Sequence, residues 1–66
     1  MNKPLRFYEL YEYTKESLQN YLVDAHGYDE DDLENFSEKE EIADHIIAQG
    51  YTEEALGYLK GLRKGE

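Results

Sequence analysis

The chain has no cysteine among its 66 residues. It can therefore form neither a disulfide nor a zinc site of the CxxC type. A domain of this size buries only about 60% of the surface that its unfolded chain exposes. The apolar core must stabilise the fold alone or with the help of an oligomer interface. We expect one domain, residues 1–66, that is a monomer or a weak homodimer.

Long apolar runs are also missing. No stretch approaches the roughly 20 apolar residues of a transmembrane helix. The first residues, Met1 to Arg6, are not followed by the apolar stretch of a signal peptide. The lack of cysteine is in keeping with a reducing compartment. The sequence therefore predicts a cytoplasmic protein with no membrane partner.

Basic residues are scarce where acidic ones are dense. Between Glu16 and Glu54 there are thirteen Asp or Glu residues and one basic residue, Lys39, and the net charge of the chain is -9. Carboxylates repel phosphates and attract Lys and Arg, which disfavours direct binding to nucleic acid or to an anionic membrane. Seven tyrosines and two phenylalanines argue against disorder. We expect a folded protein with a basic protein partner.

Strand patterns are absent, because nowhere do four or more β-branched or aromatic residues alternate with polar ones. Helical spacing appears instead. Pro4 can open a first helix over about residues 4–12, in which Leu5, Tyr8 and Tyr11 form the predicted buried face.

A second helix follows, with Thr14 as its predicted N-cap and Gly27 as its stop. Its buried stripe has four members: Leu18, Tyr21, Leu22 and Ala25. Whether the first two helices join through Tyr13 stays open. Residues 28–35 are mostly acidic and predict a loop, with or without one helical turn, that ends at Phe36.

A third helix is expected over about residues 38–48, with Ser37 and Glu40 as a capping box. Its stripe consists of Ile42, Ala43, Ile46 and Ile47, and Gly50 follows. Thr52 is the predicted cap of a last helix, in which Tyr51 packs on Leu56. The stripe continues through Leu59 and Leu62, and the basic residues at the C-terminal end are Lys60, Arg63 and Lys64. The fold class is all-α, a compact bundle of three to four short helices.

The order of these features resembles the YozE-like family of small bacterial proteins. The matching residues are Phe7, Tyr8, Leu18, Tyr21, His26, Tyr28, Phe36, Ile42, Glu54, Ala55 and Leu56. The chain differs from the family in lacking its tryptophans: Tyr21 matches in position but replaces one of them, and no tryptophan lies near Leu62. The resemblance implies a SAM-like helical fold and carries no assigned activity. A second resemblance, of the segment Leu22 to Ile47 to SAP-type modules, does not imply their nucleic-acid binding, because the segment lacks their basic residues.

Metal and catalytic motifs do not emerge. An EF-hand beginning at Asp29 would need an oxygen ligand at Leu33 and glycine at Glu34. His26 and His45 match no metal motif and are expected to be structural or surface residues. Sixteen acidic residues bring some carboxylates together by abundance alone, and a chain this short has little material to enclose an active site. We expect no metal site, no cofactor and no enzymatic activity.

Tyrosines among carboxylates are typical of binding surfaces, because tyrosine supplies rigid contact area while the acids attract a basic partner. Tyr13, Tyr28 and Tyr58 lie off the predicted stripes, so they are either exposed contact residues or boundary residues that cover the core. The predicted partner-binding set is Tyr28, Asp29, Glu30, Asp31, Asp32, Glu34, Glu38 and Glu41.

Two functions fit these features. One is an adaptor or regulatory module that binds a basic protein through a compact acidic patch. The other is a DNA mimic, encoded by a phage or mobile element, whose carboxylates form an elongated track that imitates the phosphates of a duplex. The acids are densest from Asp29 to Asp44, which favours the patch and the adaptor.

Overall fold

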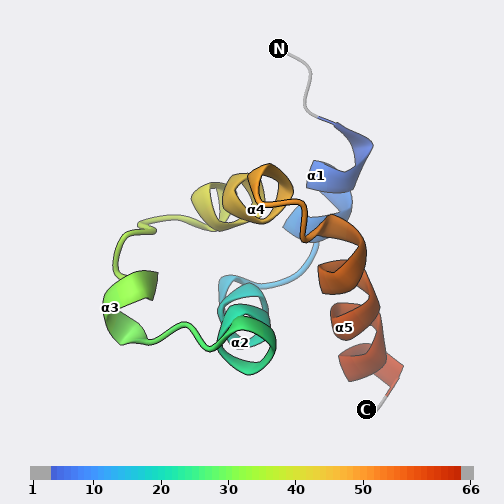
Figure 1. The fold of residues 1–66 in the computed structure, drawn as a ribbon. Coiled ribbons are helices and arrows are strands. Elements are labelled where there is room, and N and C mark those ends of the chain that lie inside the picture. The colour runs from blue at the N-terminus through green and yellow to red at the C-terminus, as the bar shows by residue number, and fades with distance from the viewer. Residues whose placement is uncertain (1–3, 65–66) are drawn as a thin grey trace.

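The computed structural model describes residues 4–64, and the side chains of residues 4–61. It contains helices and no strand within that range, as the all-α prediction requires (Figure 1). The helices are α1 (Leu5–Tyr11), α2 (Lys15–His26), α3 (Glu30–Leu33), α4 (Lys39–Ala48) and α5 (Thr52–Lys64). The one-turn helix α3 occupies the acidic segment for which a loop with or without a turn was expected.

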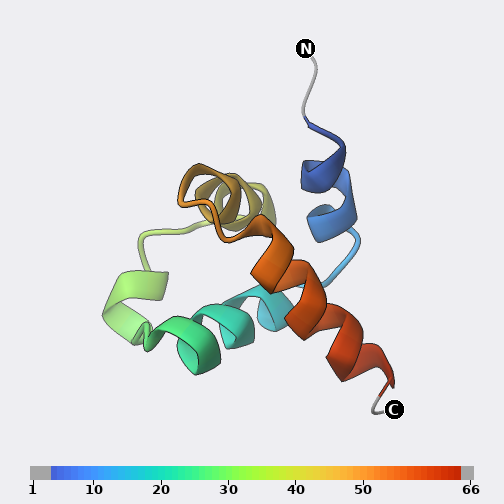
Figure 2. The ribbon, with the colours of Figure 1, turned by 45° about the vertical axis from the view of Figure 1, so that its right-hand side comes forward.

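Four of the helices form the bundle, and the remaining one, α3, lies at its edge. α1, α2, α4 and α5 pack against one another, and α3 follows the C-terminal end of α2 on the side away from α1 (Figures 1 and 2). The described chain has extents of 31 × 29 × 19 Å, so the bundle is flattened. No helix within residues 4–64 has the length and apolar character that crossing a membrane requires.

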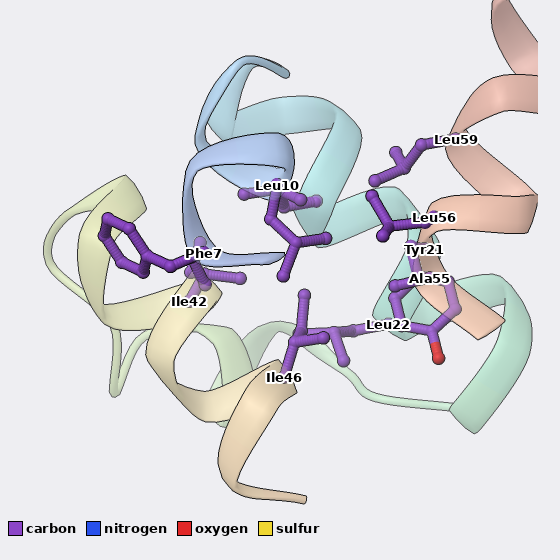
Figure 3. Close-up of a cluster of buried hydrophobic side chains, with 11 residues drawn as sticks. Phe7, Leu10, Tyr21, Leu22, Ile42, Ile46, Ala55, Leu56 and Leu59 are labelled. Carbon is purple, nitrogen blue, oxygen red and sulfur yellow. The ribbon is translucent and has the colours of Figure 1, made fainter. Parts of the chain in front are cut away.

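The core draws on all four packed helices and on none of α3. In Figure 3 the labelled side chains of α1, α2, α4 and α5 point toward one another. Among the described residues, no polar or charged type other than tyrosine is buried. The buried residues are Phe7, Leu10, Leu18, Tyr21, Leu22, Ile42, Ala43, Ile46, Ala55, Leu56 and Leu59.

The predicted stripe of α1 is wrong. Leu5, Tyr8 and Tyr11 are 81%, 50% and 42% exposed, whereas Phe7 and Leu10 are buried. The buried pair also has the i, i+3 spacing of a helical face, and its burial leaves no hydroxyl to be satisfied. Turning α1 this way keeps both phenol groups in contact with water.

The stripes of α2 and α4 agree better with the sequence. Leu18, Tyr21 and Leu22 are fully buried, while Ala25 is exposed. In α4, three of the four expected residues are buried, and Ile47 is half-buried. These helices run for three turns, which is long enough for a single face to be identified by its spacing.

The caps define where α2 begins and ends. The Thr14 side chain accepts a hydrogen bond from the backbone N–H of Ser17 at 3.0 Å. The chain leaves the helical path between α1 and α2, so they are two separate helices. Gly27 ends α2 with φ of 70°, a left-handed conformation that glycine adopts without strain.

The capping box predicted for α4 is wrong. Glu38, not Ser37, is the N-cap residue, and its side chain makes no capping hydrogen bond. The backbone N–H of Ser37 instead donates to Glu41 Oε1 at 2.6 Å. The predicted cap of the last helix is also wrong, because Thr52 is the first residue of α5. The carbonyl of Tyr51 accepts the first hydrogen bond of this helix, from the backbone N–H of Ala55 at 2.8 Å. The predictions for Leu62, Arg63 and Lys64 lie outside the described side chains.

Candidate functional site

The acidic segment is held in place by its own carboxylates. Asp29 is the N-cap of α3, and its Oδ1 accepts a hydrogen bond from the backbone N–H of Asp32 at 3.0 Å. In return, the backbone N–H of Asp29 donates to Asp32 Oδ2 at 3.3 Å. This is a capping box, and the negative charges also suit the positive end of the helix dipole. Two of the predicted partner-binding residues therefore shape α3.

Four further acidic residues of the predicted set point to solvent. Glu30 and Asp31 of α3, Glu34 at its C-cap and Glu38 before α4 are exposed. We call these four residues the acidic edge. Among the residues that the structure describes, none of them forms an ion pair. No direct ion pair within the described chain therefore neutralises these four carboxylates.

The remaining two members of the predicted set have partners inside the molecule. Glu41 accepts the Ser37 hydrogen bond described above. Tyr28 is half-buried, and its hydroxyl lies 2.8 Å from His45 Nε2. Burial raises the pKa of the Tyr28 phenol, with Tyr51 adding to the effect. Both side chains contribute to the fold at the border of the acidic edge.

The three tyrosines that lie off the predicted stripes are boundary residues that cover the core. Tyr13, Tyr28 and Tyr58 are half-buried and pack against the core. The more exposed tyrosines are Tyr8 and Tyr11, which lie on the predicted stripe of the first helix and were expected to be core or boundary residues. A phenol ring at the border covers the small core and leaves its hydroxyl within reach of polar partners.

Several cations are held elsewhere on the bundle. Arg6 forms ion pairs with Glu9 at 3.0 Å and with Glu53 at 2.9 Å. Lys39 Nζ lies 4.2 Å from the centre of the Tyr11 ring, in a cation–π contact. These contacts join α1 to α5 and α4, and none of them involves a residue of the acidic edge.

An open groove of about 410 Å³ runs beside the acidic edge. It lies between the start of α2 and α3. Lys15 bounds it on the α2 side, where its Nζ donates to the backbone carbonyl of Ser37 at 3.0 Å. The residues that line it are Lys15, Gln19, Glu30, Leu33, Glu34 and Phe36.

A second polar cluster joins α2 to α5. The Tyr21 hydroxyl donates to Glu54 Oε1 at 2.6 Å, and His26 Nε2 lies 2.7 Å from the same oxygen and 2.9 Å from the hydroxyl. A carboxylate only accepts, so Nε2 must carry a proton and donate. The His26 ring also stacks on Tyr51, with 3.9 Å between ring centres. The Tyr21 ring is fully buried, as its position on the predicted stripe of α2 indicates.

This cluster shifts the pKa values of Glu54 and Tyr21. Hydrogen bonds from Tyr21 and then from His26 lower the pKa of Glu54. Burial, followed by the hydrogen bond to Glu54, raises the pKa of the Tyr21 phenol far above its ordinary value. Both shifts favour the pair of a neutral phenol and an ionised carboxylate that the hydrogen bond requires.

A neighbouring carboxylate is engaged in the same way. The Tyr58 hydroxyl donates to Asp24 Oδ2 at 2.6 Å, and this hydrogen bond raises the pKa of the Tyr58 phenol. The Tyr58 ring packs edge-on against Tyr21, with 5.4 Å between their centres. The acids of α2 and α5 that meet here therefore serve the packing of the two helices.

Metal ligands do not converge in this molecule as far as the structure describes it. Within residues 4–64, no three His, Asp or Glu side chains lie close enough together to hold a metal ion. The two histidines instead pair with tyrosines, His26 with Tyr21 and His45 with Tyr28. Both histidines therefore take part in internal contacts of the bundle.

Two elements of this arrangement were missed in the sequence. Glu54 gave no signal of its contact with Tyr21, because 33 positions separate them and the spacing of a helix says nothing about which helix it meets. Lys15 was missed as a wall of the groove. Its place directly after the Thr14 cap indicates the first turn of α2, but the approach of Ser37 depends on the path of the chain after α3.

Comparison with family models, with curated proteins and with solved structures finds no match to this chain. The resemblance to the YozE-like family stays a prediction.

Proposed function

We propose that the protein is a non-catalytic adaptor or regulatory module of the cytoplasm that binds a basic protein through the acidic edge. The observation that carries the proposal is that Glu30, Asp31, Glu34 and Glu38 are exposed together, without an ion-pair partner among the described residues. Uncancelled charge of one sign attracts a partner of the opposite sign and raises its association rate. We further propose that the helical bundle is SAM-like.

The distribution of the other acids supports a patch. Asp24 and Glu54 accept hydrogen bonds from tyrosines, and Glu9 and Glu53 pair with Arg6. A DNA mimic needs a continuous track of free carboxylates along the molecule. Here these four carboxylates of α1, α2 and α5 are engaged in internal contacts, so the adaptor is the favoured function.

The proposal is tested by capture from a lysate of the native host with matched variants. The edge variant is Asp31→Lys/Glu34→Lys, which spares the capping residues Asp29 and Asp32. The control is Glu12→Lys/Glu16→Lys, which changes the net charge by the same amount at exposed positions outside the edge. Mass spectrometry should identify a basic protein that the wild type and the control capture and the edge variant does not.

The purified partner then provides a kinetic test. Its association rate should fall about tenfold on the edge variant or in high salt, with a smaller change in dissociation rate. A partner that binds both variants and the wild type alike would show that the acidic edge is not the binding surface. Competition for the partner by duplex DNA would indicate the mimic instead.

A further inference from the structure

We infer that the groove between α2 and α3 receives an arginine side chain of the basic partner. This inference rests on the proposed function and adds to it the residue that the partner must present. The α3 side of the groove carries carboxylates, the α2 side carries hydrogen-bond donors, and two further lining residues supply apolar surface. Each of these features matches one part of an arginine residue.

The α3 wall supplies the acceptors. Glu30 and Glu34 are four residues apart, so their side chains lie on the same face of the helix. Both line the groove, both are exposed, and neither forms an ion pair among the described residues. A guanidinium carries five N–H donors in a planar fork and can serve both carboxylates. The single ammonium of lysine matches such a pair less well.

The floor supplies carbon surface. Leu33 and Phe36 line the groove and are half-buried, because their inner sides pack against the core. The Phe36 ring packs against the His45 ring, with 4.9 Å between ring centres. The three methylene groups of an arginine can cover such a surface while its charged end stays at the rim, and a guanidinium also stacks on an aromatic face.

The α2 wall fixes the orientation of the occupant. Lys15 and Gln19 bring donors to this side, and the carbonyl of Ser37 holds the Lys15 ammonium in place. The positive charge of Lys15 repels a second cation, so the guanidinium must lie on the α3 side. The carbonyl groups of the partner backbone then face Lys15 and Gln19.

The size of the groove limits what can enter it. About 410 Å³ is near the lower end of the roughly 300 to 1,000 Å³ range of ligand pockets. This volume is sufficient for one long side chain with its adjoining backbone. The rest of the partner would remain outside, where the acidic edge contributes long-range attraction.

The test uses blocked Gly-Arg-Gly and Gly-Lys-Gly peptides, titrated into the full chain at low salt and followed by amide chemical shifts in NMR. Gly-Arg-Gly should shift the amides of Gln19, Leu33 and Phe36 and should bind at least about twofold more tightly than Gly-Lys-Gly. Equal affinities, or shifts outside the groove, would overturn the inference.

Matched double variants distinguish the contribution of the groove carboxylates to binding from that of the general negative charge. Glu30→Gln/Glu34→Gln removes two charges from the groove, and Asp31→Asn/Glu38→Gln removes two from the same edge outside it. The first variant should bind Gly-Arg-Gly about fivefold more weakly than the wild type, and the second should bind it less than about twofold more weakly. Unchanged spectra elsewhere would confirm that both variants fold.

A hexa-arginine peptide distinguishes the two proposals. If both variants weaken its binding equally, charge alone attracts basic ligands, so the groove inference fails while the proposed function stands. If the wild type does not bind hexa-arginine even at low salt, the acidic edge attracts no basic ligand and both proposals fail.

Discussion

The α2–α5 contact and the α3 edge use the same chemical group in opposite ways. Where α2 meets α5, Glu54 and Asp24 accept hydrogen bonds from tyrosine hydroxyls at 2.6 Å. At the α3 edge, Glu30 and Asp31 are exposed and form no ion pair among the described residues. Net charge alone therefore does not locate a binding surface, because a carboxylate that accepts a hydrogen bond from a tyrosine already has a structural function.

The two regions also differ in how they are stabilised. The α2–α5 side lies over the core, with Leu22, Ala55 and Leu59 buried. α3 buries no residue and depends on its capping box and on the half-buried Leu33. We therefore expect substitutions in the core and at the α2–α5 contact to change global stability, and those on α3 to act locally.

The largest effect is expected for Ile46→Ala. Ile46 is fully buried, and truncating such a side chain costs about 2 to 5 kcal/mol. The total stability of a domain this small is on the order of 5 kcal/mol. Urea unfolding followed by circular dichroism should show a largely unfolded chain near body temperature. Val23→Ala, at a position 40% exposed, is the control. A loss below about 0.5 kcal/mol at Ile46 would contradict the packing of α4.

Tyr21→Phe should have the next largest effect, because it removes the hydroxyl that donates to Glu54. The expected loss at neutral pH is about 1 to 2 kcal/mol. The folded state holds the phenol proton more tightly than the unfolded state, so this contribution is complete below the ordinary pKa of 10.0 and falls as the pH rises further. The gap in urea midpoint between the wild type and Tyr21→Phe should narrow above pH 10.

The control for this pH dependence is Tyr8→Phe, since Tyr8 is half exposed. It should leave the neutral midpoint almost unchanged. A gap between the wild type and Tyr21→Phe that stays constant up to pH 11 would show that the phenol does not couple to folding.

Removing the caps of α2 and α3 is expected to have smaller effects, which should differ between the two helices. Thr14 caps α2 and Asp29 caps α3, each through a 3.0 Å hydrogen bond to a backbone N–H. Thr14→Ala should lower global stability by about 1 kcal/mol. Asp29→Ala should change it by less than about 0.5 kcal/mol, because α3 can fray without opening the core. Amide hydrogen exchange should show the loss of protection confined to the Asp32 to Glu34 segment. Equal global losses would mean that α3 is part of the cooperative core.

Glu54→Gln is expected to have the smallest effect, because the amide keeps an acceptor for Tyr21 and the carboxylate is partly solvated. Since the pKa of Glu54 is lowered in the folded state, its charge stabilises the fold above the ordinary pKa of 4.5, and this contribution is lost as the pH falls further. The urea midpoints of the wild type and Glu54→Gln should differ at pH 7 and converge toward pH 3. Glu30→Gln is the control and should follow the wild type. A gap that stayed the same at both pH values would exclude the charge as its cause.

The fold was predictable where the helices are long. α2 and α4 run for about three turns, so their stripes could be assigned from spacing. α1 has seven residues, and on so short a helix both Leu5-Tyr8-Tyr11 and Phe7-Leu10 satisfy helical spacing. The choice between them depends on which face meets α4, a tertiary contact that spacing does not encode.

The exposure of these acidic side chains was predictable, but the role of each residue was not. The four residues of the acidic edge belong to the predicted partner-binding set, and all four are exposed. The division between Asp29 and Asp32 as caps and Asp31 as a free carboxylate follows from the start of α3, and helix boundaries are the least predictable feature of a sequence. The groove depends on Lys15 reaching Ser37, 22 positions away, so no local pattern could reveal it.

The contact between Tyr21 and Glu54 also bears on folding kinetics. The two residues are 33 positions apart, so their hydrogen bond forms only when α5 has returned to α2. Each helix of the bundle can form from local contacts, whereas this bond must await the closure of a long loop. An interaction that is absent from the transition state changes the unfolding rate and leaves the folding rate nearly constant. The buried phenol and its carboxylate are therefore expected to lengthen the lifetime of the folded chain without making it fold faster.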